Sequence, residues 1–151
     1  MFLDPFRGEQ TGWLDGRAVW TTLAPLRYHH AAHGVLAIPA EFITDLASTP
    51  RAPFTFWIAG GRGTRSAVLH DFVYQFGYWP RVGGGRVYVT KGEADAAFYA
   101  SLLADPISGA VGWVARAMYE AVRFGGRGIW RCDARRNAMN PIWSMTGVDL
   151  P

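Results

Sequence analysis

Cysteine is nearly missing from this sequence, since Cys132 is the only one among 151 residues. A single thiol excludes an intramolecular disulfide, and it excludes a zinc site built from several thiolates. The fold must therefore be held together by core packing, as it is in cytosolic proteins.

Long apolar runs are also missing. Arg, Asp, Pro or Gly interrupts every apolar run well before the roughly 20 residues that a membrane-spanning helix needs. The N-terminus lacks a basic segment followed by an apolar one, so we expect neither a signal peptide nor a transmembrane helix. Hydrophobic residues make up 50% of the chain and charged residues 18%. This composition is typical of a folded globular protein, and the length favours one domain spanning residues 1–151.

Lysine is scarce, because Lys91 is the only one among the 15 basic residues and the rest are arginines. Arginine suits anionic partners, including phospholipid head groups. The formal net charge is +3, and the charges are scattered along the chain. A solvated surface is therefore the simpler interpretation, and we expect no nucleic-acid partner.

The fold class that these patterns predict is α+β. Residues 1–43 form a β-rich N-terminal part with a small hairpin or sheet, because short apolar or β-branched runs at 18–23 and 35–43 alternate with Gly and Pro. Residues 44–126 form a loop followed by a three-helix core, and residues 127–151 form a C-terminal extension without sustained periodicity. The loop at 44–63 carries an aromatic cluster that is either core or an exposed apolar lip, namely Phe54, Phe56 and Trp57.

Three helices are expected in this core. The first covers residues 64–76, capped by Thr64 or Ser66 and ended by Gly77. Residues 77–85 read as a turn-rich connection and residues 86–90 as a strand. Thr90 and Glu93 then form a capping box for a helix that runs to Leu103. The third helix covers about 108–124, with an apolar stripe of Trp113, Val114, Ala117, Met118, Ala121 and Val122.

The first of these helices contains three polar residues inside an apolar run, AVLHDFVYQF. His70 and Tyr74 are four residues apart and point the same way, whereas Asp71 is rotated by about 100°. A histidine serves as a general base when a carboxylate holds its other ring nitrogen, and Asp95 in the next helix is the best candidate. With the two helices antiparallel, Asp95 reaches the imidazole and the Tyr74 hydroxyl donates to the same carboxylate.

Asp71 faces elsewhere and is available for a cation. Asp45, in the loop before the helix, would supply further oxygen ligands of the kind that Ca²⁺ takes. Each residue also has a purely structural interpretation. Asp45 could cap a turn, Asp95 could stabilise a helix N-terminus, and a His beside an Asp is more often a core or surface pair than a catalyst.

Four segments together resemble a known arrangement: TDLASTP (44–50), AVLHDFVYQFG (67–77), ADAAFYASL (94–102) and MYEAVRFGG (118–126). They are similar to the short prokaryotic branch of the phospholipase A2 family, which has a calcium loop with an Asp, a helix with His-Asp and Tyr, and a further helix with an Asp. The patterns D-x-x-S-x-P, HD-x-x-Y and AD-x-x-F also resemble an uncharacterised family found largely in phages and prophages. We expect the chain to belong to that family, with phospholipase A2 as a remoter relative and a phospholipase A2-like three-helix core.

The resemblance implies a calcium-dependent ester hydrolase that acts on phospholipid at a membrane surface. His70 would deprotonate the attacking water, Asp95 would orient the imidazole, and Tyr74 would support Asp95. Asp45, Asp71 and the backbone carbonyl near Leu46 would hold Ca²⁺. This chain departs from the family in lacking disulfides and an obvious Gly-rich calcium loop.

Two other functions remain open. One is a non-catalytic phage structural or accessory protein, which keeps the polar cluster as a buried network and binds other phage proteins. The other is a nucleotide phosphohydrolase of the HD type, with His29 or His30, His70-Asp71 and Asp95 as metal ligands in an all-helical domain. The extended character of residues 18–43 argues against the latter. The expected location is the host cytoplasm or the virion.

Overall fold

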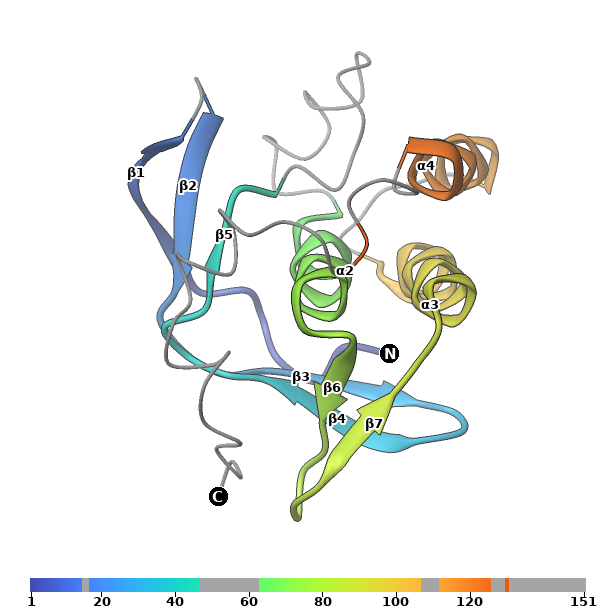
Figure 1. Ribbon diagram of the computed structural model, residues 1–151, viewed down its shortest axis with the longest axis horizontal. Coiled ribbons are helices and arrows are strands. Elements are labelled where there is room, and N and C mark those ends of the chain that lie inside the picture. Colours follow the sequence, from blue (N-terminus) through green and yellow to red (C-terminus); the bar gives the residue numbers. More distant parts are fainter. Residues whose placement is uncertain (15–16, 47–62, 107–111, 126–129, 131–151) are drawn as a thin grey trace.

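The computed structural model describes residues 1–14, 17–46, 63–106, 112–125 and 130. Within these residues, ten helices and strands follow one another along the chain, and Figure 1 shows their arrangement. They are β1 (Gly8–Leu14), β2 (Arg17–Thr22), β3 (Leu26–His30), β4 (Gly34–Ile38), β5 (Ile43–Thr44), α2 (Thr64–Phe76), β6 (Tyr78–Pro80), β7 (Arg86–Tyr88), α3 (Lys91–Ala104) and α4 (Gly112–Gly125).

The described strands form three small antiparallel sheets. The first has the order β1-β2-β5, and a register shift between Gln10 and Gly12 interrupts the pairing of β1 with β2. The second is the β3–β4 hairpin, and the third is the β6–β7 pair. In β3, Leu26 and Tyr28 are buried while Arg27 is exposed, which is the alternation expected of a strand with one face on the core.

Helix α2 occupies the centre of the molecule, between the strands on one side and α3 on the other (Figure 1). Every residue of α2 except Phe76 is buried. A helix that is buried on all sides has no solvated face on which polar residues can be placed without cost. His70, Asp71 and Tyr74 therefore lie in the interior, where each needs partners.

The prediction of a three-helix, phospholipase A2-like core is wrong. The main core cluster combines α2 with side chains of β3, β4 and β6, together with Phe42 and two alanines of α3. Helix α4 packs on α3 in a second, smaller cluster that includes Phe98, Leu102 and Met118. The fold is mixed, but its core is rich in sheet, because strands rather than helices cover much of α2.

Several local predictions are confirmed. Helix α2 covers Thr64–Phe76 and ends at Gly77, whose backbone lies in the left-handed region with φ 75°. Thr90 and Glu93 form the expected capping box at the start of α3. No helix in the part of the chain that the structure describes is long and apolar enough to cross a membrane.

Other local predictions need correction. Gly63, with no side-chain hydrogen bond, precedes α2 in place of a capping Thr64 or Ser66. Tyr78–Pro80, expected in a turn-rich connection, is a strand because it pairs with Arg86–Tyr88. Trp113 is 71% exposed and does not belong to the buried stripe of α4.

Three further predictions fall on residues outside the described ranges. These are the aromatic cluster of Phe54, Phe56 and Trp57, most of the C-terminal extension at 127–151, and the beginning of the third helix at 108–111. The division of the chain into one domain with three parts stays a prediction.

Candidate functional site

The candidate site is built on α2, which presents His70 and Tyr74 on one face. Their rings lie 4.0 Å apart between centroids, and the Phe98 ring of α3 lies 4.8 Å from the imidazole. His70 is 1% exposed. The imidazole is therefore held between aromatic rings, and its orientation is fixed by packing as well as by hydrogen bonds.

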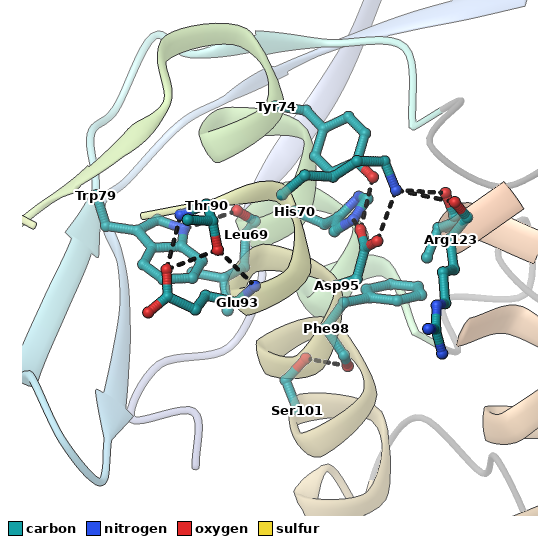
Figure 2. Close-up of polar contacts among 12 residues, drawn as sticks. Leu69, His70, Tyr74, Trp79, Thr90, Glu93, Asp95, Phe98, Ser101 and Arg123 are labelled. Carbon is teal, nitrogen blue, oxygen red and sulfur yellow. Dashed lines mark hydrogen bonds and ion pairs between the residues drawn. The ribbon is translucent and has the colours of Figure 1, made fainter. Parts of the chain in front are cut away.

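Asp95 of α3 completes the predicted contact. Its Oδ1 lies 3.0 Å from His70 Nε2, and it accepts a hydrogen bond of 2.5 Å from the Tyr74 hydroxyl. Figure 2 shows the three side chains meeting between α2 and α3. Asp95 is 2% exposed, so these partners replace the water that a carboxylate would otherwise bind.

Lys91 is a fourth member of this cluster. Its Nζ donates to Asp95 Oδ2 at 2.7 Å, from one turn earlier in α3. The same Nζ donates to the backbone carbonyls of Val122, at 3.3 Å, and Arg123, at 3.0 Å, near the end of α4. Each oxygen of the Asp95 carboxylate thus has its own donors, with His70 and Tyr74 on Oδ1 and Lys91 on Oδ2.

These contacts determine the charges of Asp95 and Tyr74. Burial alone would raise the pKa of Asp95, but hydrogen bonds from His70, Lys91 and Tyr74 lower it below its ordinary value of 3.8. Burial and the Asp95 carboxylate raise the pKa of the Tyr74 hydroxyl far above 10.0, so Tyr74 is a neutral donor. Because an ionised carboxylate only accepts hydrogen bonds, the imidazole proton lies on Nε2. In a neutral imidazole of this tautomer, Nδ1 is the ring nitrogen that carries the lone pair.

Asp71 points away from this cluster, as its rotation around α2 predicts. Its Oδ2 accepts a very short hydrogen bond from the hydroxyl of Thr44, the last residue of β5. The Thr44 Oγ1 accepts in turn from the backbone N–H of Leu46 at 3.0 Å, and Leu46 lies in the left-handed region with φ 52°. Asp71 therefore anchors the turn that follows β5.

Of the three predicted calcium ligands, Asp45 and Leu46 directly follow β5, and Asp71 contacts its last residue. Calcium takes six to eight oxygen ligands, usually including several carboxylates. The described residues contain no group of three His, Cys, Asp or Glu side chains placed to share an ion. One oxygen of Asp71 accepts a hydrogen bond from Thr44. Asp45, between Thr44 and Leu46 in the sequence, is buried. Calcium at Asp45, Leu46 and Asp71 stays a prediction, and no chemical step below depends on it.

The sequence did not predict two partners in this region, Lys91 and Thr44. The i to i+4 spacing of Lys91 and Asp95 on a helix with a clear capping box was the available signal for Lys91. No comparable signal pointed to Thr44, because β5 is only two residues long and its contact with Asp71 joins segments 27 residues apart.

The HD-type arrangement is not present among the described residues. His29 and His30 lie in strand β3, and the His30 ring stacks on His33 at a centroid distance of 4.6 Å. A phosphohydrolase of the HD type requires the first histidine on a helix, so the position of His29 and His30 on a strand argues against this function.

The polar cluster lies within the part of the chain that matches a known family. The model of a family described as a protein of unknown function, DUF1353, matches residues 20–122, a span that includes His70, Asp71, Tyr74, Lys91 and Asp95. No curated protein and no solved structure matches the chain. Since the matched span covers more than half of the sequence, the chain belongs to the DUF1353 family of proteins of unknown function.

Proposed function

We propose that this protein hydrolyses an ester bond, with His70 as general base. The observation that carries the proposal is the buried Asp95 carboxylate, which contacts His70 Nε2 at 3.0 Å and is itself held by Tyr74 and Lys91. A carboxylate on one ring nitrogen is what holds an imidazole in the tautomer needed to take a proton at the other.

The chemistry of each group follows from these contacts. As the oxygen of a water molecule bonds to the ester carbonyl carbon, one water proton passes to His70 Nδ1, and the carbonyl electron pair moves to its oxygen. Asp95 stabilises the imidazolium that forms. When the tetrahedral intermediate collapses, the bond to the alcohol oxygen breaks and that oxygen takes the proton from Nδ1. The products are a carboxylic acid and an alcohol.

The proposed substrate is a phospholipid, which would give a fatty acid and a lysophospholipid. Support comes from the resemblance of the His70, Tyr74 and Asp95 motifs to those of phospholipase A2, which concerns the chemistry of the site and not the fold. Arginine makes up nearly all of the basic residues and suits anionic head groups. Association with phages, in the host cytoplasm or the virion, belongs to the same proposal.

The second candidate is a non-catalytic phage component that uses the cluster only to hold α2 and α3 together. The observation that favours it is the complete burial of the His70 side chain. A substrate reaches His70 only after neighbouring side chains move. Under this second candidate, Asp95→Asn lowers stability and the parent protein turns over no ester.

The direct test is hydrolysis of phosphatidylglycerol vesicles, with released fatty acid and lysophospholipid measured by mass spectrometry. We expect the parent to release both products and His70→Gln to lose at least about 100-fold in rate, because general-base catalysis contributes a factor of this order. His29→Gln is the matched control, since His29 is exposed on β3 and outside the cluster. No release by the parent from vesicles or from soluble esters, or equal rates for parent and His70→Gln, would refute the proposal.

Calcium is tested separately, by calorimetric titration of Ca²⁺ into metal-free protein. The expectation from the resemblance requires binding that Asp71→Asn weakens, because a neutral amide is a poorer ligand for a hard cation. If the parent binds no Ca²⁺, Asp71 is not a calcium ligand, and the general-base proposal is unaffected.

A further inference from the structure

Lys91 lies outside the His70–Asp95 pair but contacts several of the groups around it. Its Nζ has a hydrogen-bond acceptor for each of its three N–H groups: Asp95 Oδ2, the Val122 carbonyl and the Arg123 carbonyl. It also lies 5.6 Å from the centroid of the Tyr74 ring. Lys91 therefore contacts both residues that hold the imidazole, as well as a separate helix.

The place of this lysine is unfavourable for its own helix. Lys91 is the first residue of α3, where the helix dipole disfavours a positive charge. The carbonyls at the end of α4 carry the opposite partial charge and favour it. The cation is therefore stabilised by its contacts with α4 and Asp95. A lysine side chain that pointed into solvent would make neither contact. Its side chain is only 20% exposed.

The shape of the side chain matters as much as its charge. An ammonium group is compact and directs three donors tetrahedrally, whereas a guanidinium is a planar fork. Acceptors on two helices form a tripod that suits the first and not the second. Lysine occurs once in a chain that otherwise uses arginine, and it occurs at this tripod.

We propose that Lys91 is a positioning residue of the site, which holds the Asp95 carboxylate in register with His70 by tying it to the end of α4. This inference rests on the proposed function where it concerns turnover, but the contact itself can be tested without any substrate. The consequence is that α4, which supplies no side chain to the His70–Asp95 pair, still determines how that pair is oriented.

The test compares the parent with Lys91→Met, whose unbranched side chain is one atom shorter and lacks the charge and the donors. One readout is the NMR signal of the His70 Nε2 proton, assigned by its loss in His70→Gln. The other is steady-state hydrolysis of a soluble phospholipid ester. We expect the His70 signal to shift or broaden in Lys91→Met, and kcat to fall by about 10-fold or more with KM unchanged, since small misplacements of a catalytic group have effects of this size.

The matched control is Arg116→Met, which removes one positive charge from an exposed i to i+4 pair with Glu120 on α4. It should leave both readouts unchanged. Should Lys91→Met fail to fold, reductive dimethylation of the folded parent perturbs the hydrogen bonds of Lys91 instead. Lys91 is the only lysine that can react, and the modified amine keeps its charge but has one N–H donor in place of three. The N-terminal amine reacts as well, so the control is the same treatment of Lys91→Arg protein, which has no lysine and should show no further change in either readout.

An unchanged His70 signal and an unchanged kcat after loss of Lys91 would overturn the proposal. If the parent turns over no ester, the proposed hydrolase function is refuted. If the His70 signal still shifts in Lys91→Met, the positioning role is supported. The two conclusions are therefore distinguishable.

Discussion

Asp95 is the residue on which the electrostatics of the site depend. It is almost completely buried and has three donors, from two helices. The sequence placed His70 and Tyr74 on one face by their helical spacing, and it predicted their contact with Asp95 on the assumption that the two helices pack antiparallel. It did not predict the burial of every side chain around His70, which depends on strands far away in the sequence.

We expect Asp95 to contribute to stability in a pH-dependent way. Its pKa in the folded protein lies below the ordinary 3.8, so its contribution is fully present above that value and is lost as the pH falls through the folded pKa. Asp95→Asn should lower the free energy of unfolding by about 2 kcal/mol near neutral pH, because the charge-assisted hydrogen bonds are weakened. Urea unfolding at about pH 7 and about pH 3 measures the difference between parent and variant.

The difference should narrow at the lower pH, because pH 3 lies below the ordinary pKa of 3.8 and the unfolded parent then binds a proton that the folded parent binds less well. A difference that stays constant between the two pH values would show that the ionised carboxylate is not what stabilises the fold.

At the scale of elements, the helix limits were predictable because local signals determine them. Gly77 ends α2 with its N–H donating to the Val73 carbonyl at 2.7 Å, and Thr90 with Glu93 begins α3. The capping residue of α2 was not predictable in the same way. Thr64 and Ser66 are good capping residues, but Gly63 takes the position before the helix in a left-handed conformation. Strand β6 was missed because three residues with a proline carry little strand signal by themselves.

Two glycine substitutions test this account of the helix limits. Gly77→Ala should lower the free energy of unfolding by about 1 kcal/mol, because its φ of 75° is unfavourable for a residue with a Cβ. Gly92→Ala should raise it by about 0.5 kcal/mol, because Gly92 lies in the first turn of α3 and an added Cβ has no neighbour closer than 4.0 Å. Urea unfolding of both variants is sufficient. Effects of the same sign would contradict the assigned conformations.

For the whole molecule, the mixed α/β character was predictable and the packing was not. The sequence contains an apolar helix and separate strands, but no local sequence pattern indicates that β3, β4 and β6 pack on α2. The resemblance to phospholipase A2 favoured a core of three helices, and that was wrong, because strands pack on α2 together with α3. What the resemblance shares with the structure is the local cluster of His70, Tyr74 and Asp95, whose contacts need only α2 and α3.

A buried ion pair joins three distant parts of this packing. Arg65 at the start of α2 forms a very short hydrogen-bonded ion pair with Asp105, directly after α3, and donates to the Asp4 carbonyl at 3.0 Å. Its guanidinium also lies 5.0 Å from the centroid of the Phe2 ring. These contacts connect the first residues of the chain to both helices of the site.

Arg65→Met should therefore lower the free energy of unfolding by about 3 kcal/mol, because Asp105 stays buried without this cation. Adding Asp105→Asn should recover part of the loss. Arg116→Met, at an exposed pair, should cost about 0.5 kcal/mol or less. Equal losses in Arg65→Met and Arg116→Met, measured by urea unfolding, would show that the buried pair does not join the parts of the core.

The central claim is that Asp95 holds the proton of a neutral His70 on Nε2 and so leaves Nδ1 as the base. The measurement that tests it most directly is the ¹⁵N chemical shift of each ring nitrogen of His70 in the parent protein, assigned with His70→Gln. The account predicts a protonated Nε2 and an unprotonated Nδ1, with the Nε2 proton lost as a resolved signal in Asp95→Asn. A proton on Nδ1 of the neutral ring would mean that Nε2 accepts from a protonated Asp95, and it would contradict both the charge state of the site and the proposed mechanism.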